Sequence, residues 1–158
     1  MLDFSKIFGK KKPNIVFLVD GPNIIRKAFN IDLIEIKKEL QKYGNIRVGK
    51  IYLDQYASDK LIEAMINQGF QTEITTGDVD VTMAIEAMEY VLDPNIDILA
   101  LMTRDTDYRP VLVKAKARGK KTIILATDVA FSAALKNTAD KVIIFKGNGN
   151  IETITNSD

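Results

Sequence analysis

Short apolar runs alternate with amphipathic segments along this chain. The apolar runs are about four to eight residues long and rich in branched side chains, which is typical of strands buried on both faces of a parallel sheet. They predict six strands, at residues 14–19, 46–53, 70–75, 96–102, 122–126 and 142–145. Between them, apolar side chains recur at helical spacing, with capping residues in front or glycines behind. These segments predict helices at residues 32–44, 58–69, 81–92, 110–118 and 132–139.

This alternation predicts a single-domain α/β protein with three layers. The mostly parallel sheet should have five or six strands, with helices on both faces and right-handed crossovers. We expect a basic N-terminal tail at residues 1–12, the folded domain at 13–146, and a tail or an edge hairpin at 147–158. In the third helix, the stripe predicted to face the core consists of Val81, Ala84, Ile85, Met88, Val91 and Leu92.

The amino-acid composition limits which catalytic groups and metal ligands the chain can use. The chain of 158 residues has no cysteine and no histidine, which excludes disulfides, thiolate nucleophiles, imidazole bases and the usual zinc sites. The formal net charge is +1, so a nucleic-acid partner needs a local basic surface. We find no apolar run that could span a membrane and no secretory signal, and we therefore expect a cytoplasmic protein.

Five aspartates follow predicted strands. Asp20 ends the first strand, Asp78 and Asp80 come after the third, and Asp105 and Asp107 come after the fourth. Ligands of open parallel sheets bind outside the carboxyl ends of the strands, so these side chains should meet in space.

Each of these aspartates also fits a structural role. Asp20 fits a turn, Asp80 and Asp107 fit helix caps, and Asp78 and Asp105 fit solvated loops. Together, however, several carboxylates at one sheet edge repel each other unless a cation neutralises them. An oxygen-only cluster selects a hard ion such as Mg²⁺ or Mn²⁺, which suits phosphodiester hydrolysis.

Three segments, VDGPNI, GDVDV and TRDTDYRPVL, resemble the signature segments of NYN domains, a branch of the PIN-like nuclease superfamily. The resemblance extends from about residue 14 to 145 and is closest to small archaeal NYN proteins of unassigned role. It implies a PIN-like fold and an acidic pocket for Mg²⁺ or Mn²⁺. The residues that it marks as catalytic and metal-binding are Asp20, Asp80, Asp105 and Asp107.

The substrate-binding candidates adjoin these aspartates. Asn23 is the asparagine of the first signature segment, and Thr103 offers a hydroxyl beside the cluster. Many family members have Ser-Gly where this chain has Thr103 and Arg104, and Lys-Gly where it has Gly77 and Asp78. Arg104 is a candidate to replace the lysine as a phosphate contact.

Other residues have competing interpretations. Glu86 stands where many members carry a helical aspartate, yet its helical phase also fits a solvated glutamate. Tyr56 and Tyr108 are candidates for base stacking or for packing. Basic residues that could line an RNA path, or simply be solvated, are Arg26, Lys27, Arg104, Arg109, Lys114 and Lys116.

The leading hypothesis is therefore a metal-dependent ribonuclease that acts on single-stranded RNA. The alternative is a regulatory RNA-binding NYN module that does not cleave. A Toprim domain and an aspartyl phosphatase fit less well, because they need a glutamate or a DxD motif after the first strand. A receiver domain fits less well, because its phosphoacceptor and lysine have no counterpart that we can place. A homodimer is left open, and the cluster Lys10, Lys11 and Lys12 is a candidate contact for RNA or another anionic surface.

Overall fold

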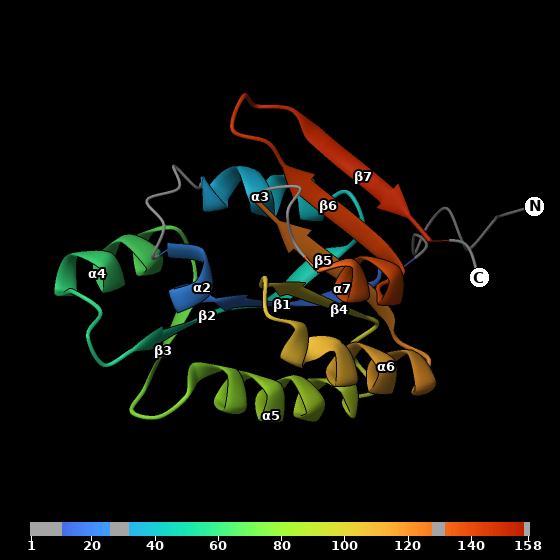
Figure 1. The fold of residues 1–158 in the computed structure, drawn as a ribbon, viewed down its shortest axis with the longest axis horizontal. Coiled ribbons are helices and arrows are strands. Elements are labelled where there is room, and N and C mark those ends of the chain that lie inside the picture. The colour runs from blue at the N-terminus through green and yellow to red at the C-terminus, as the bar shows by residue number, and fades with distance from the viewer. Residues whose placement is uncertain (1–10, 26–31, 128–131, 157–158) are drawn as a thin grey trace, which may run out of the picture.

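A single sheet forms the centre of the computed structural model, which describes residues 11–25, 32–127 and 132–156 (Figure 1). The strand order is β3-β2-β1-β4-β5-β6-β7. Neighbouring strands from β3 to β6 are parallel, and β7 pairs antiparallel with β6 at the edge. The predicted mostly parallel α/β sheet is thus confirmed. The strands are β1 (Asn14–Asp20), β2 (Asn45–Asp54), β3 (Gln71–Thr75), β4 (Ile98–Met102), β5 (Lys121–Ala126), β6 (Lys141–Phe145) and β7 (Ile151–Thr155).

Helices cover both faces of the sheet, as predicted (Figure 1). One core lies between the sheet and α3 and α4, and the other lies between the sheet and α5, α6 and α7. The described helices are α2 (Gly21–Ile25), α3 (Leu33–Leu40), α4 (Asp59–Asn67), α5 (Val79–Val91), the 3-10 turn η1 (Thr106–Tyr108), α6 (Arg109–Ala117) and α7 (Ala133–Thr138).

The predicted helix signals at three positions are seen in the structure. The Asp32 carboxylate accepts hydrogen bonds from the backbone N–H groups of Ile34 and Glu35 at the start of α3. The Ser58 hydroxyl accepts one from the N–H of Leu61 in α4. Gly69 follows α4 with a φ of 85°, a left-handed conformation that favours glycine. Local chemistry therefore sets these helix ends.

The predicted buried stripe of α5 is half correct: Val91 is buried and Ala84 and Met88 pack against the core. The other three, Val81, Ile85 and Leu92, are 54%, 59% and 58% exposed. The fully buried side chains of the helix are Val79, Met83, Ala87 and Val91. The helix begins two residues before the predicted start and carries apolar side chains on two faces. Periodicity therefore indicated the helix correctly, but only packing against the sheet decides which face is buried.

Glu86 is neither a solvated residue nor a member of the aspartate cluster. It forms an ion pair with Lys50 of β2, whose side chain is 8% exposed against 21% for Glu86. Burial alone would lower the pKa of Lys50, but the hydrogen bond and the charge of Glu86 outweigh it, so the pKa lies above its ordinary value. This pair joins α5 to the sheet.

The strand order places a topological switch point between β1 and β4. From β1 the chain continues to β2 and β3 on one side, and β4, β5 and β6 extend the sheet on the other. Connections on the two sides diverge at the carboxyl ends of β1 and β4, which opens a crevice there. No helix in the described residues is long and apolar enough to cross a membrane.

Candidate metal centre

Asp20 occupies the carboxyl end of β1, at the switch point. It is 2% exposed, and its register partner on β2 is Tyr52. The next residue, Gly21, lies so close to β2 that a Cβ atom there would be 2.3 Å from the carbonyl oxygen of Tyr52. Only glycine fits this approach, so the turn out of β1 depends on it.

The Asp20 carboxylate is held by two neighbours. Asn23 donates its side-chain N–H to Oδ2 at 2.6 Å, and the Thr103 hydroxyl donates to the same oxygen at 3.2 Å. Burial raises the pKa of Asp20 above its ordinary value; these hydrogen bonds oppose the rise, and the charge of Asp105 adds to it. Asn23 and Thr103 thus fix the direction of a carboxylate that is costly to keep ionised.

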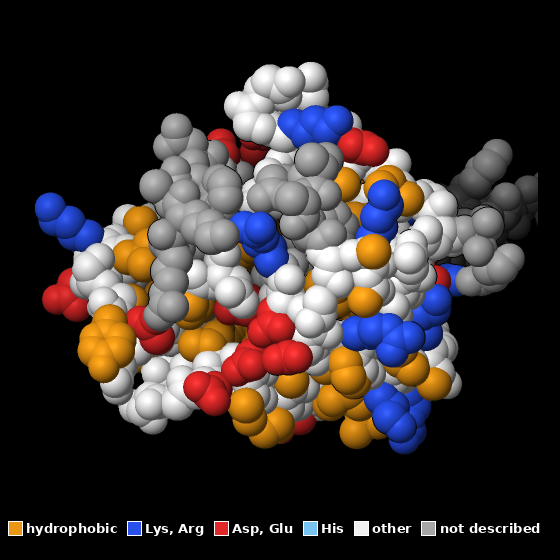
Figure 2. Space-filling model, viewed as in Figure 1, with side chains coloured by type: hydrophobic (Ala, Val, Ile, Leu, Met, Phe, Trp, Pro, Cys, Tyr) orange, Lys and Arg blue, Asp and Glu red, His pale blue; other side chains and the backbone are white. Residues whose placement is uncertain are grey.

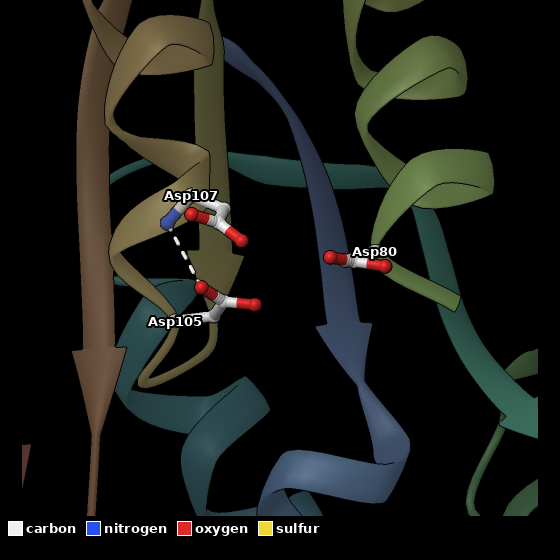
Figure 3. A group of neighbouring side chains, drawn as sticks. All are labelled: Asp80, Asp105 and Asp107. Atoms are coloured by element: carbon white, nitrogen blue, oxygen red, sulfur yellow. Dashed lines mark hydrogen bonds between the residues drawn. The ribbon is translucent and has the colours of Figure 1, made fainter. Parts of the chain in front are cut away.

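Three further carboxylates converge from two elements. Asp80 projects from the first turn of α5, whereas Asp105 and Asp107 lie in the connection between β4 and α6, facing it (Figure 3). One oxygen from each carboxylate lies within 4.8 Å of the other two. Asp105 also accepts a hydrogen bond from the N–H of Asp107 at 2.9 Å, which shapes the turn.

A pocket of about 210 Å³ adjoins this group, with Asp80 and Asp105, but not Asp107, in its lining. Asp20, Asp80 and Asp105 line it together with two more aspartates, Asp54 and Asp78. Among the residues that the structure describes, its lining contains no lysine or arginine. On the face drawn in Figure 2, acidic side chains accordingly gather in one central group. We refer to this feature as the acidic pocket.

Sequence reasoning missed Asp54. It is the last residue of β2, so the rule that singled out Asp20 at the end of β1 would have found it. The predicted strand stopped one residue short, and none of the three signature segments contains this position.

Tyr108 lies beneath the acidic pocket, not on the surface. Its side chain is fully buried, and its hydroxyl has no hydrogen-bond partner among the described residues. Burial raises the pKa of this hydroxyl, and the negative charges of Asp20, Asp80 and Asp105 raise it further. The hydroxyl therefore lies close to the carboxylates, and Tyr108 is unavailable for stacking on a base.

The structural roles considered for the aspartates are only partly seen. Asp105, rather than Asp107, caps the 3-10 turn η1. Asp78 occupies the N-cap position of α5 but makes no side-chain cap hydrogen bond, and Asp80, inside the first turn, accepts a hydrogen bond only from the N–H of the next residue, Val81, among the described residues. Capping alone therefore does not account for the three carboxylates that face one another.

Some predicted substrate contacts lie elsewhere. Arg104 is half-buried beside Asp105 but does not appear among the described residues of the pocket lining. Arg109 is exposed at the start of α6, whereas Lys114 and Lys116 lie in its last turn. Since a helix rises by about 1.5 Å per residue, these two lysines lie farther from the pocket than Arg109 does. Lys116 also donates to the carbonyl of Thr138. Arg26 and Lys27 fall outside the described residues.

Comparison with known proteins agrees with this geometry. The profile of the family described as "NYN domain" matches residues 14–150. The chain belongs to the NYN domain family. NYN domains are part of the PIN-like nuclease superfamily, whose members generally use divalent metals.

The chain is similar to two further proteins, one by sequence and one by fold. An uncharacterized protein of the archaeon Methanocaldococcus jannaschii is 54% identical over 144 residues, which cover 88% of this chain and 60% of that protein. This chain therefore spans about three fifths of that relative. A crystal structure of a Vibrio parahaemolyticus protein of unknown function superposes with a TM-score of 0.74 at 21% identity, covering 87% of this chain and 94% of the other. This second likeness bears on the fold alone.

The residues of the acidic pocket fit a divalent cation. The available donors are carboxylate and hydroxyl oxygens, which are the ligands preferred by hard ions. Three carboxylates from two segments far apart in the sequence face one another, and the buried Tyr108 hydroxyl beside them lacks a described partner. A cation would offset the repulsion that this arrangement otherwise creates.

Proposed function

We propose that this NYN protein is a metal-dependent ribonuclease that hydrolyses phosphodiester bonds of single-stranded RNA. The observation that carries the proposal is the group formed by Asp80, Asp105 and Asp107, whose carboxylate oxygens lie within 4.8 Å of one another at the switch point of the sheet. Membership of a nuclease superfamily supports the reaction class.

In this proposal the aspartates have two different roles. Asp80, Asp105 and Asp107 hold Mg²⁺ or Mn²⁺, and Asp20 supplies a fourth, buried carboxylate. A divalent ion, when bound, activates a water molecule and stabilises negative charge on a phosphate, so no histidine base is needed. Asn23 orients Asp20 through the 2.6 Å hydrogen bond, which fixes where its charge points.

The charge of the acidic pocket explains why a metal is central to the proposal. Five aspartates line the pocket, and the described lining offers no lysine or arginine to attract a phosphate. A phosphate inside the pocket would be repelled unless bound cations offset the local charge, so RNA binding in chelator would depend on contacts outside this pocket. Thr103 would act indirectly, because its hydroxyl donates to Asp20 and helps to orient that carboxylate. We propose Arg104 and Arg109, at the same edge of the sheet, as contacts to the RNA backbone.

One observation favours a second candidate, a regulatory RNA-binding module that does not cleave. Asp78 lines the acidic pocket at a position where many family members have the glycine of Lys-Gly. Gly77, which also lines the pocket, stands in place of the lysine, so a cationic phosphate contact is lost, and Asp78 adds a negative charge. Such a pocket would still bind a metal but would place the substrate less well for cleavage.

The homodimer considered from the sequence has a candidate surface on α5. The exposed apolar residues Val81, Ile85 and Leu92, with the half-buried Met88, recur at intervals of four, three and four residues. This is the heptad spacing by which one helix packs against another. Dimerisation through this face and a cytoplasmic location remain predictions.

The test of the proposed function is metal-dependent product formation. The wild-type protein is incubated with end-labelled single-stranded RNA in Mn²⁺ and, separately, in chelator, and binding is measured in parallel at the same salt concentration. We expect cleavage in Mn²⁺ and binding without cleavage in chelator. Binding with no product in either condition, from protein shown to be folded by circular dichroism, would favour the non-cleaving module.

A further inference from the structure

A second pocket adjoins the acidic pocket on the side of α4. It has a volume of about 340 Å³, and the two pockets share Pro22 and Asp54 as lining residues. Its remaining lining is mostly apolar and consists of Gly21, Leu53, Tyr56, Ala57, Ser58 and Leu61. In Figure 2, hydrophobic side chains are visible beside the acidic group on the α4 side. We refer to this second feature as the apolar pocket.

Tyr56 stands out at the rim of the apolar pocket because it is 83% exposed. Its position is fixed by the backbone: the N–H of Tyr56 donates to the Asp54 carboxylate at 2.9 Å, and the N–H of Ala57 donates to the carbonyl of Asp54 at 3.1 Å. The turn between β2 and α4 thus holds an aromatic ring in solvent, beside an apolar surface. A large exposed ring at a concave site is a common feature of ligand-binding surfaces.

We infer that the apolar pocket with Tyr56 is a base-stacking subsite for the RNA nucleotide next to the phosphate in the acidic pocket. The inference rests on the proposed function, because it takes RNA as the ligand of the acidic pocket. The two pockets are adjacent, because both are lined by Pro22 and Asp54, so a strand whose phosphate lies at the aspartates has its next base within reach of the tyrosine.

The chemistry of the apolar pocket matches a nucleobase. A base presents a flat apolar face, which the exposed Tyr56 ring and the half-buried Leu61 side chain can cover. The Ser58 hydroxyl already accepts a hydrogen bond from the N–H of Leu61 at the start of α4. The pocket is therefore better suited to stacking on the face of a base than to forming hydrogen bonds with its edge. Stacking alone tolerates any base, and we therefore expect weak sequence preference at this nucleotide.

The subsite also explains how an acidic pocket retains an anionic strand. Stacking of one base on an aromatic side chain contributes enough affinity that its removal weakens binding by about 5- to 150-fold. This contribution does not depend on charge. It therefore acts together with the bound ion and the arginines at the edge, and it persists when the ion is removed.

The experiment combines Tyr56 variants with RNA that lacks one base. Binding of single-stranded RNA is measured in chelator, and cleavage kinetics are measured in Mn²⁺, for the wild type, Tyr56→Ala and Tyr56→Phe. A parallel set of RNAs carries a single abasic position, moved stepwise along the strand. Ile66→Ala serves as the matched control, because Ile66 is an exposed apolar residue of α4 (55%) outside the apolar pocket.

We expect Tyr56→Ala to weaken binding and raise KM by about 5- to 150-fold with little change in kcat. Tyr56→Phe and Ile66→Ala should behave as the wild type, since stacking needs the ring and not the hydroxyl. At one abasic position, the wild type should lose as much affinity as Tyr56→Ala does on intact RNA, and the two changes together should cause no further loss.

A fluorescent variant gives a readout that does not depend on cleavage. The chain has no tryptophan, so Tyr56→Trp introduces a single reporter. Intact RNA should change its emission in chelator, whereas RNA with the critical base missing should not. This measurement detects stacking even if the protein is a binding module.

The outcomes separate the inference from the proposed function. Metal-dependent cleavage with unchanged KM and binding in Tyr56→Ala would overturn the subsite and leave the nuclease intact. RNA binding without product, together with the abasic coupling to Tyr56, would overturn the nuclease and keep the subsite. A Tyr56→Ala defect that is equal on intact and on every abasic RNA would refute stacking, and absence of RNA binding by folded protein would refute both.

Discussion

Replacing Asp105 with asparagine separates the electrostatic role of the acidic group from its role in the turn. Asp105 accepts the N–H of Asp107 at 2.9 Å through Oδ1. Asparagine keeps an oxygen acceptor at this position but removes the negative charge. The variant should therefore preserve the 3-10 turn while changing the repulsion inside the group formed by Asp80, Asp105 and Asp107.

The expected magnitude follows from the distances. Two unit charges 4.8 Å apart repel by about 1 kcal/mol in water, and by more where the surroundings are less polar. Asp105 takes part in two of the three pairs, and all three residues are at least partly exposed, so its removal should stabilise the metal-free protein by about 1–2 kcal/mol. For a chain of this length, this corresponds to a rise in Tm of about 2–8 °C.

A bound ion should stabilise the wild type more than Asp105→Asn. At an ion concentration of about 100 times Kd, the wild type gains about 2.7 kcal/mol, or about 5–11 °C in Tm. Asp105→Asn should gain less than half of this at the same concentration, because it lacks one ligand charge. Tm is measured by circular dichroism in chelator and across a Mn²⁺ titration.

Asp93→Asn is the matched control. Asp93 accepts the N–H of Asn95 at 2.8 Å in the same kind of turn, but it lies between α5 and β4, at the opposite edge of the sheet. This control should respond to Mn²⁺ as the wild type does. If Asp105→Asn and Asp93→Asn give the same Tm in chelator and the same gain in Mn²⁺, the aspartates are turn residues and our account of a metal centre is wrong.

Three further predictions concern other parts of the structure. The pKa of Asp20 is raised in the folded state, so the protonated form of Asp20 favours folding. This contribution to the free energy of unfolding is complete below the ordinary pKa of 3.8 and is lost as pH rises through the raised pKa. In chelator, urea unfolding should therefore show Asp20→Asn to be more stable than the wild type at pH 7, and the difference should vanish as pH falls toward 3.8. Lys50→Met should lower the free energy of unfolding by about 3 kcal/mol, because it leaves Glu86 half-buried without its partner, and adding Glu86→Leu should recover most of the loss; an undiminished loss in the double variant would contradict this reasoning. In sedimentation equilibrium the wild type should behave as two copies and Ile85→Glu as one with unchanged Tm, and equal masses would exclude α5 as the interface.

Much of the fold could be predicted from the sequence because its signals are local. Four of the six parallel strands, β1, β4, β5 and β6, are marked by continuous apolar runs, and caps such as Asp32 and Ser58 act within a few residues. The short helix α2, which follows Asp20 directly, was not predicted, because five residues are too few to show a helical period.

The parts that were missed depend on tertiary packing. The buried face of α5 is chosen by the sheet, which leaves Ile85 in solvent and turns Glu86 toward Lys50. The location of the aspartates was predictable from strand ends alone, and the structure brings Asp80 and Asp105 together from segments far apart in the chain. Whether Tyr56 or Tyr108 is exposed could not be read from the pattern, because both follow short polar segments beside a strand or helix end.

Asp20→Asn tests most directly whether the acidic pocket cleaves RNA with the help of a bound metal. The single-turnover cleavage rate of one labelled single-stranded RNA is measured in Mn²⁺ at fixed salt for the wild type, Asp20→Asn and Asp93→Asn, with binding measured on the same samples. We predict that Asp20→Asn lowers the rate by orders of magnitude while binding is unchanged or tighter, and that Asp93→Asn matches the wild type. Equal cleavage rates in all three proteins would contradict the account and would place the activity in another site or in a contaminating nuclease.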